Sequence, residues 1–316
     1  MLGPWPHASR LGTRARGGSL VMPRLLVDGV AFHVEVAGKG APLLLLHGFT
    51  GSGESWASLI PAFARHFLTV AIDLLGHGRS DSPSDPRRYR IDRAAGDTLA
   101  VLDQLGLTRA AVLGYSMGGR LALFLAAHAP DRINALILES AAPGILDPAE
   151  RRARAVRDRA LADSIERDGI TAFVDRWERL PLFATQSRLA AAERAALRTQ
   201  RLAQCPRGLA NSLRGMGQGE QPPLFEDLPA LSMPVLVVVG AMDTAYCRLG
   251  GEITRAIPRA RLVIVPGAGH TVHLERAEEF RQAVLGFLAP GASGGGGNDD
   301  SRPDAHASGE FAGEVT

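Results

Sequence analysis

The sequence is poor in lysine, cysteine and aromatic residues. Lys39 is its single lysine, so arginines supply almost all of the positive charge, and the net charge is only +2. Such a small net charge gives no reason to expect a nucleic-acid partner. Cys205 and Cys247 have no metal-ligand spacing and are a poor disulfide framework. We therefore expect no metal site, and a protein of a reducing compartment such as the cytoplasm.

Long apolar runs are also missing. No stretch of about 18 apolar residues is present, so we expect no membrane-spanning helix. The two ends are polar or small in character. Residues 1–23 contain arginines but no acid, which predicts an unstructured leader; a start codon upstream of the true one and a targeting segment are the alternatives. Residues 291–316 are rich in glycine, serine and aspartate, which predicts a disordered tail.

Between these ends the sequence is rich in apolar residues, and 46% of the whole chain is hydrophobic. Residues 25–27 and 31–37 flank Asp28-Gly29 and predict an antiparallel hairpin. Continuous apolar runs, typical of strands covered on both faces, lie at 42–47, 68–73, 110–114, 133–139, 235–240 and 261–265. Helical patterns lie between them at 56–64, 91–105, 117–129 and 277–288. This alternation predicts an α/β fold with a mostly parallel, doubly covered sheet.

The alternation stops at residues 144–227, which carry no convincing strand. Helical patterns occur there at 149–166, 171–179 and 186–204. A helical insertion between two strands is expected to form a lid over the carboxyl edge of the sheet, where such folds bind ligands. The alternative, a separate domain, would have to bury its own core within a short segment. The predicted core then comprises residues 24–143 and 228–290.

The segment Gly114-Tyr115-Ser116-Met117-Gly118 matches the pattern G-x-S-x-G between an apolar strand and a helix. In that context the small residues allow a sharp turn that exposes a nucleophilic serine. The alternative is an ordinary strand–helix turn whose serine caps the helix.

A catalytic serine needs a base and a group that orients the base. Asp243 and His270 each follow a predicted strand, in the chain order Ser…Asp…His that this motif requires. His273 is a competing base, but Gly267 and Gly269 make the loop before His270 flexible, which favours His270.

Two backbone amides are candidates for an oxyanion hole. The loop HGFTGS at 47–52 follows an apolar strand and would supply the amide of Phe49, and the residue after the serine, Met117, would supply the other. A glycine-rich turn without this role is the alternative. A further glycine-rich loop, DLLGHGRS at 73–80, is expected to be structural.

The motifs HGFTGS, DLLGHGRS, GYSMGG, GAMD and GAGH together resemble those of the α/β-hydrolase family, over about residues 24–290. The resemblance implies an α/β-hydrolase fold with a Ser116–His270–Asp243 triad. The family hosts many reactions, so this resemblance alone leaves the substrate open.

Arg120 restricts the possible substrates, because it lies one helical turn beyond the serine. A charge there must be paired, either by an internal acid or by an anionic substrate. GYSMGGR, together with the arginine-rich segments ERRARAVRD, FVDRWERLPLF and AALRTQR, is similar to the 2-succinyl-6-hydroxy-2,4-cyclohexadiene-1-carboxylate synthases of menaquinone biosynthesis. That resemblance implies a lyase that eliminates pyruvate, uses its triad as a base and needs no cofactor. It assigns substrate contacts to Tyr115, Arg120, Arg154, Trp177 and Arg198.

Two other functions stay open at this point. A serine carboxylesterase or C–C bond hydrolase would use the same triad through a covalent intermediate. A non-catalytic binding protein of this fold is expected to have a broken triad, whereas all three members are present here.

Overall fold

Strands β1 (Leu20–Val27) and β2 (Val30–Gly38) form the predicted hairpin, with Val27 paired to Val30 across the turn. Asp28 and Gly29 have φ values of 48° and 75°, the left-handed pair that a two-residue hairpin turn requires. The computed structural model describes residues 20–289. Strand β1 therefore begins within the predicted leader, while residues 1–19 of that leader and the predicted tail at 291–316 lie outside the described residues.

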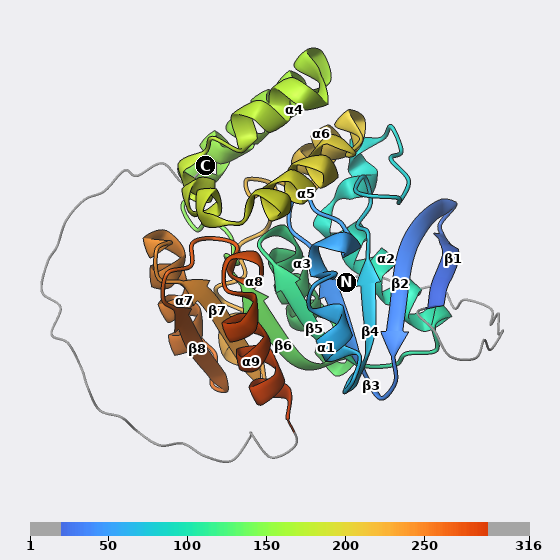
Figure 1. The fold of residues 1–316 in the computed structure, drawn as a ribbon, viewed down its shortest axis with the longest axis vertical. Helices are drawn as coiled ribbons and strands as arrows, with labels where there is room; N and C mark the ends of the chain where they lie inside the picture. Colours follow the sequence, from blue (N-terminus) through green and yellow to red (C-terminus); the bar gives the residue numbers. More distant parts are fainter. Residues whose placement is uncertain (1–19, 290–316) are drawn as a thin grey trace, which may run out of the picture.

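The sheet has eight strands in the order β1-β2-β4-β3-β5-β6-β7-β8 (Figure 1). The β1–β2 and β2–β4 pairs are antiparallel, and all other neighbouring pairs are parallel, as the α/β prediction required. The remaining strands are β3 (Ala41–Leu46), β4 (Phe67–Ile72), β5 (Ala110–Tyr115), β6 (Ile133–Glu139), β7 (Val235–Gly240) and β8 (Ala260–Val265).

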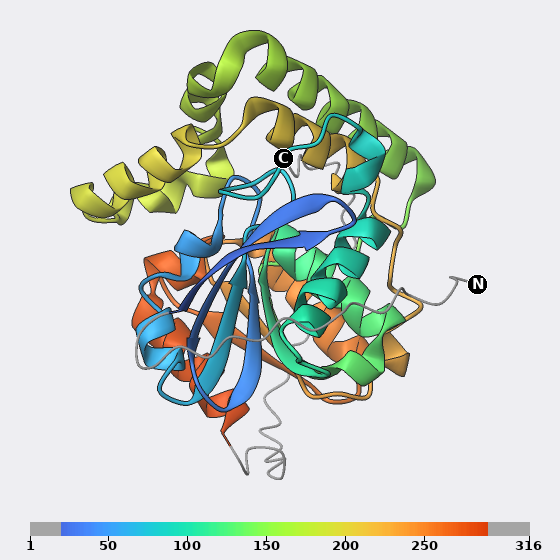
Figure 2. The same cartoon turned by 90° about the vertical axis from the view of Figure 1, so that its right-hand side faces the viewer.

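Helices cover both faces of the sheet (Figure 2). On β3, Leu44 and Leu46 enter the core shared with α2 (Ile91–Gln104), α3 (Met117–His128) and α7 (Thr244–Ala256). Leu43 and Leu45 enter the opposite core, which includes α1 (Ile60–Phe63), α8 (Val272–Glu275) and α9 (Ala277–Leu288). All four leucines are fully buried. The continuous apolar run therefore reflects burial on both sides of the strand.

Between β6 and β7 the described chain forms helices only, and we call residues 144–227 the lid. It comprises α4 (Pro148–Trp177), the 3₁₀ segment η4 (Pro181–Arg188), α5 (Ala191–Leu202) and α6 (Pro206–Met216). Figure 1 shows these helices stacked over one edge of the sheet. Buried apolar side chains of α4 and α6, including Ile165, Phe173 and Leu209, form a small core of their own.

The lid helices differ from the sequence prediction in three places. The two helices predicted at 149–166 and 171–179 are present as the two halves of α4, which are separated by a non-helical break at Gly169 (φ 82°, ψ 170°); the difference is that the first half continues to this break and that the two halves follow each other directly. The helix predicted at 186–204 begins only at Ala191, because η4 occupies the residues before it. Helix α6 was not predicted, since Pro206 and Gly208 weaken its helical signal. Gly208 is needed there, because an added Cβ would lie 2.2 Å from the carbonyl oxygen of Gly76.

Short 3₁₀ turns account for other irregular segments. Where a helix was predicted at 56–64, the structure has η1 (Gly53–Trp56) followed by the four-residue α1. The others are η2 (Pro86–Tyr89), η3 (Pro130–Arg132) and η5 (Leu228–Ala230).

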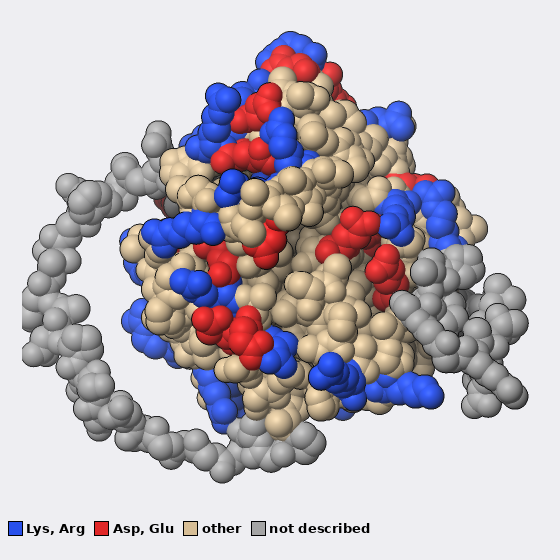
Figure 3. All heavy atoms as spheres, viewed as in Figure 1, with Lys and Arg blue, Asp and Glu red and all other residues tan. Residues whose placement is uncertain are grey.

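The described surface offers no extended basic face in the view of Figure 3, where arginines and acids alternate. No helix among residues 20–289 has both the length and the apolar character needed to cross a membrane.

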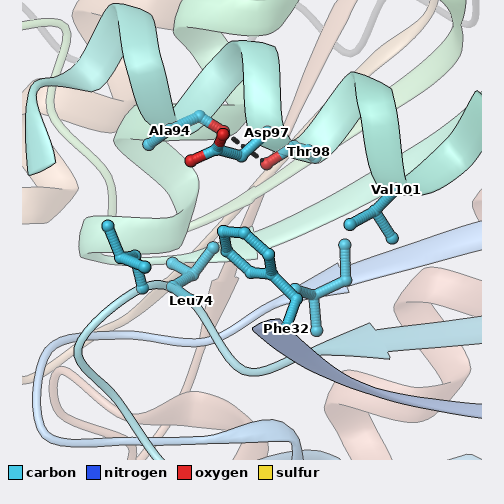
Figure 4. Close-up of a pocket in the computed structure, with 8 residues that line it drawn as sticks. Phe32, Leu74, Ala94, Asp97, Thr98 and Val101 are labelled. Carbon is cyan, nitrogen blue, oxygen red and sulfur yellow. Dashed lines mark hydrogen bonds between the residues drawn. The ribbon is translucent and has the colours of Figure 1, made fainter. Parts of the chain in front are cut away.

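A small cavity lies beneath α2 and is lined by Phe32, Leu74, Asp97 and Val101 among others (Figure 4). Its volume of about 10 Å³ is enough for one water molecule at most. Asp97 is engaged by Arg88 at 2.5 and 2.7 Å. None of the predicted site residues lines this cavity, so it lies apart from the candidate site.

Candidate active site

Ser116 sits at the sharp turn between β5 and α3. Its φ of 48° and ψ of −107° are strained for a residue with a side chain, and such strain costs on the order of 1–3 kcal/mol. The Ser116 amide is held by the carbonyl of Glu139 at 2.8 Å. The flanking glycines are required, since a Cβ on Gly114 or Gly118 would lie 2.4 or 2.2 Å from a backbone oxygen. The turn is therefore a nucleophile elbow in geometry as well as in sequence.

The structure brings Ser116, His270 and Asp243 together, although they are separated widely in the sequence. His270 Nε2 lies 3.2 Å from Ser116 Oγ, and His270 Nδ1 lies 2.7 Å from Asp243 Oδ2. His270 is 2% exposed and Asp243 is 9% exposed. Asp243 also caps α7 by accepting a hydrogen bond from the Tyr246 amide at 3.2 Å. This arrangement fixes the imidazole with one nitrogen on the acid and the other on the serine.

Glu275 holds the loop that carries His270. Its two carboxylate oxygens accept hydrogen bonds from the amides of Gly269 at 2.7 Å and Thr271 at 3.2 Å, on either side of the histidine. The competing base, His273, is bound by a different acid: its Nδ1 lies 2.8 Å from Glu139 Oε2. Of the two histidines, only His270 therefore contacts both Ser116 and Asp243.

The two expected oxyanion donors keep their amides available. Among the described residues, neither Phe49 nor Met117 donates its N–H to a protein acceptor. Met117 begins α3, so its amide is one of the unpaired donors at a helix N-terminus. The loop that carries Phe49 is held by His47. The Nδ1 atom of His47 donates to Gly48 O at 2.8 Å, and its Nε2 atom accepts from the Leu74 amide at 3.0 Å.

Arg120 has no carboxylate partner among the described residues. Its guanidinium donates to the carbonyl of Met216 at 2.9 Å and to Gln221 Oε1 at 3.1 Å. Desolvation lowers the pKa of Arg120 to about 10, and nearby Tyr246 opposes this shift while Arg154 adds to it. The side chain is still cationic at neutral pH. The internal acid that the sequence left open as its partner is absent from its contacts.

Arg154, on α4, contributes to the same region. Its Nε donates to Asp158 Oδ1 at 2.8 Å, one helical turn along α4. Asp158 is 3% exposed and also accepts from the Gly219 amide at 3.2 Å. Asp158 is thus in direct contact with Arg154 and acts on Arg120 only through its charge, which partly offsets the lowering of the Arg120 pKa. One acid therefore serves two arginines, and no carboxylate among residues 20–289 binds Arg120 directly.

Arg198 is engaged within the lid. It donates to Asp175 at 2.6 Å and to Glu178 at 2.7 Å, and these hydrogen bonds raise its pKa. Arg201, which the sequence did not single out, is the more buried of the two, at 4% exposed. It binds Glu178 at 3.1 Å and Gln186 at 3.0 Å.

Aromatic rings connect the lid to the triad. Trp177 packs against Phe49 and Phe183 at 5.4 Å between ring centroids, and Phe183 meets His270 edge-on at 6.2 Å. The Trp177 Nε1 donor is buried and has no partner among the described residues. The Tyr115 hydroxyl lies 3.0 Å from Thr271 Oγ1, so it contacts the His270 loop.

Several of these positions escaped the sequence analysis. Glu139 ends an apolar run, and a single acid at a strand end is an ordinary feature. Gln221 and Glu275 lie outside any motif. The available signal was the placement of Glu139 immediately before the carboxyl edge of the sheet, where such folds build their sites. No group of three or more His, Cys, Asp and Glu residues suited to a metal ion occurs within residues 20–289.

Comparison with known proteins identifies the family of the chain. The family model of the alpha/beta hydrolase fold matches residues 41–277. A protein of Bacillus subtilis (strain 168), provisionally named a 2-succinyl-6-hydroxy-2,4-cyclohexadiene-1-carboxylate synthase, is 45% identical over 83% of this chain and 96% of its own length. The synthase of Serratia proteamaculans (strain 568) is 32% identical over 78% of this chain and 92% of its own.

A solved structure gives the same result. MenH from S. aureus superposes with a TM-score of 0.78 and 33% identity, covering 81% of this chain and 97% of that one. The chain belongs to the α/β-hydrolase family and, within it, to the family of the 2-succinyl-6-hydroxy-2,4-cyclohexadiene-1-carboxylate synthases.

Proposed function

We propose that the protein is a carbon–oxygen lyase that converts 2-succinyl-5-enolpyruvyl-6-hydroxy-3-cyclohexene-1-carboxylate to 2-succinyl-6-hydroxy-2,4-cyclohexadiene-1-carboxylate and pyruvate, in menaquinone biosynthesis. The observation that carries the proposal is Arg120. It is a cation beside the triad, held by a carbonyl and an amide oxygen and by no carboxylate among residues 20–289. Such a group favours a site that receives an anion.

The substrate carries three carboxylates, and we assign two of them to Arg120 and Arg154. Forked guanidinium donors suit carboxylates in geometry as well as in charge. Trp177 supplies an apolar wall and a free Nε1 donor for the ring of the substrate. The resemblance also assigns substrate contacts to Tyr115 and Arg198. Their polar atoms are engaged by Thr271 and by lid acids, so we propose that these two residues support the walls of the site instead.

The chemistry follows from the positions of the double bonds. A 3-cyclohexene becomes a 2,4-cyclohexadiene when a proton leaves C2, the ring double bond shifts, and the C5–O bond breaks. Ser116 Oγ, whose own proton passes to His270 Nε2, takes the C2 proton. The electron pair expels the C5 oxygen as the enolate of pyruvate, which is then protonated to pyruvate. Asp243 orients His270 and stabilises its cation.

C2 bears the succinyl carbonyl, which explains the need for an oxyanion hole. Loss of the C2 proton places negative charge on that carbonyl oxygen, where the amides of Phe49 and Met117 stabilise it. No bond between Ser116 and the substrate is required, and no cofactor takes part. The site is proposed to work in the cytoplasm, where Cys205 and Cys247, both free thiols, stay reduced.

A coupled pyruvate assay tests the proposal. The upstream enzyme generates the substrate in place, and lactate dehydrogenase reports pyruvate. We expect pyruvate release by the wild type and almost none by Ser116→Ala. Hydrolysis of p-nitrophenyl esters with a burst, without pyruvate release, would instead identify a carboxylesterase.

A further inference from the structure

A second histidine–carboxylate pair lies beneath the nucleophile elbow and takes no part in the proton transfers described above. Glu139, the last residue of β6, is 0% exposed, and His273 is 1% exposed. His273 Nδ1 lies 2.9 and 2.8 Å from the two carboxylate oxygens of Glu139. The amide of His273 also donates to Glu139 Oε1 at 2.9 Å. The carboxylate therefore binds both the ring and the main chain of His273.

Glu139 also binds the nucleophile through its main chain. Its carbonyl oxygen accepts the hydrogen bond from the Ser116 amide at 2.8 Å. His273 lies three residues after His270, at the start of α8. One residue thus holds the elbow with its carbonyl and the segment that follows the base with its carboxylate.

The rings around His273 leave Glu139 as its only polar side-chain partner among the described residues. The His273 ring packs against Trp56 at 4.6 Å and Tyr115 at 4.9 Å between centroids. His273 Nε2 has no hydrogen-bond partner among the described residues, so Glu139 is the polar anchor of the ring. A buried pair of this kind contributes little to stability compared with apolar side chains of similar volume. The pair is better explained by the way it holds the segment after His270 against the turn that carries Ser116.

We propose that Glu139 is a positioning residue that sets the separation of Ser116 and His270 by fixing the His270–His273 segment against the elbow. The proposal rests on the proposed function only for the choice of substrate, because any chemistry at Ser116 needs the same separation. A displacement of about 1 Å in such a pair can cost on the order of a hundredfold in rate.

Two positions supply the variants. Glu139→Gln keeps the shape of the side chain and its hydrogen bond to the His273 amide, but it presents an NH₂ group to the proton on Nδ1. His273→Leu removes the ring donor, whereas His273→Asn keeps an N–H donor near the position of Nδ1. Glu278→Gln is the matched control, since it removes a carboxylate from the exposed surface of α9.

Three quantities are measured for each full-length variant: kcat and KM for pyruvate release, and the rate of Ser116 labelling by a fluorophosphonate. We expect Glu139→Gln and His273→Leu to lower both kcat and the labelling rate by roughly tenfold to a hundredfold, with KM within about threefold of wild type. His273→Asn is expected to restore most of both rates, and Glu278→Gln to match the wild type.

Three outcomes decide the question. A folded Glu139→Gln variant with wild-type kcat and labelling overturns the proposal, as does a His273→Asn variant as slow as His273→Leu. If Glu139→Gln does not fold, the two His273 variants carry the test; if His273→Leu does not fold, because it leaves the Glu139 carboxylate buried without the ring, Glu139→Gln carries it. If the wild type releases no pyruvate while Glu139→Gln still labels slowly, the proposed function fails and the positioning role stands.

Discussion

Gln221 accepts a hydrogen bond from Arg120 at 3.1 Å, at a place where a buried ion pair would have a carboxylate. Gln221 is itself fully buried, so it anchors the guanidinium without neutralising it. The buried charge lowers the free energy of unfolding of the ligand-free protein, and an anion that binds to Arg120 removes this destabilisation. Arg120 is therefore expected to contribute to activity and to contribute little to stability.

Arg120→Met removes the charge and keeps the length of the side chain. We expect kcat/KM for pyruvate release to fall by roughly tenfold to a hundredfold, as for a charge-assisted contact of about 1.5–3 kcal/mol. The free energy of unfolding, measured with guanidinium chloride, should equal or exceed that of the wild type.

Arg198→Met is the matched control. Its cation is engaged by Asp175 and Glu178 in the lid, so we expect a smaller loss of kcat/KM than for Arg120→Met. Equal losses for the two variants, or full activity in Arg120→Met, would contradict the assignment of Arg120 to a substrate carboxylate.

The elbow predicts a strict requirement for glycine at position 118. A Cβ there would lie 2.2 Å from the carbonyl oxygen of Leu46, a backbone atom that cannot move alone. Gly118→Ala should lower the melting temperature and nearly abolish activity. Gly251→Ala, on α7, is the control, because its Cβ meets nothing within 4 Å and alanine is favoured in helices by up to about 1 kcal/mol. Comparable damage from both variants would remove the argument for a close approach at the elbow.

Two buried histidines predict how stability depends on pH. Burial lowers the pKa of His47 from 6.5 to about 4, and burial, followed by the proximity of His47, lowers that of His77 to about 3. Both stay neutral in the folded protein at pH 5, whereas the unfolded chain binds protons below about pH 6.5. The unfolded state then holds more protons, so the free energy of unfolding falls as the pH drops through this window.

The expected loss between pH 7.5 and 5 is up to roughly 2 kcal/mol for each histidine. Guanidinium chloride unfolding at the two pH values measures it. The variant His77→Asn should show a shallower dependence, since one of the two groups no longer titrates. A wild-type stability that is constant or rises on acidification would contradict the neutral, buried state of both side chains.

The sequence predicted the parts of the fold that depend on local pattern. Continuous apolar runs identified strands β3 to β8, and the G-x-S-x-G turn, Asp243 and His270 were found because each follows a strand. The helix α6 was missed because its glycine is required by contact with Gly76, 132 residues away, and such a contact leaves no local pattern.

The finer site could not be predicted for the same reason. Arg120 and Arg198 look alike in the sequence, and their difference lies in tertiary partners: Gln221 for one, two acids for the other. The partner of His273 could not be predicted either, because Glu139 ends a different strand, 134 residues away in the sequence.

The central claim is that Ser116 accepts a proton and forms no bond to the substrate. It is tested most directly by measuring the intact mass of the wild-type protein quenched during steady-state pyruvate release, with Ser116→Ala in parallel. We predict continuous pyruvate release by a wild-type protein of unmodified mass, and no release by the variant. A substrate-derived adduct on Ser116 that forms and decays at the rate of turnover would contradict the account and identify a covalent mechanism.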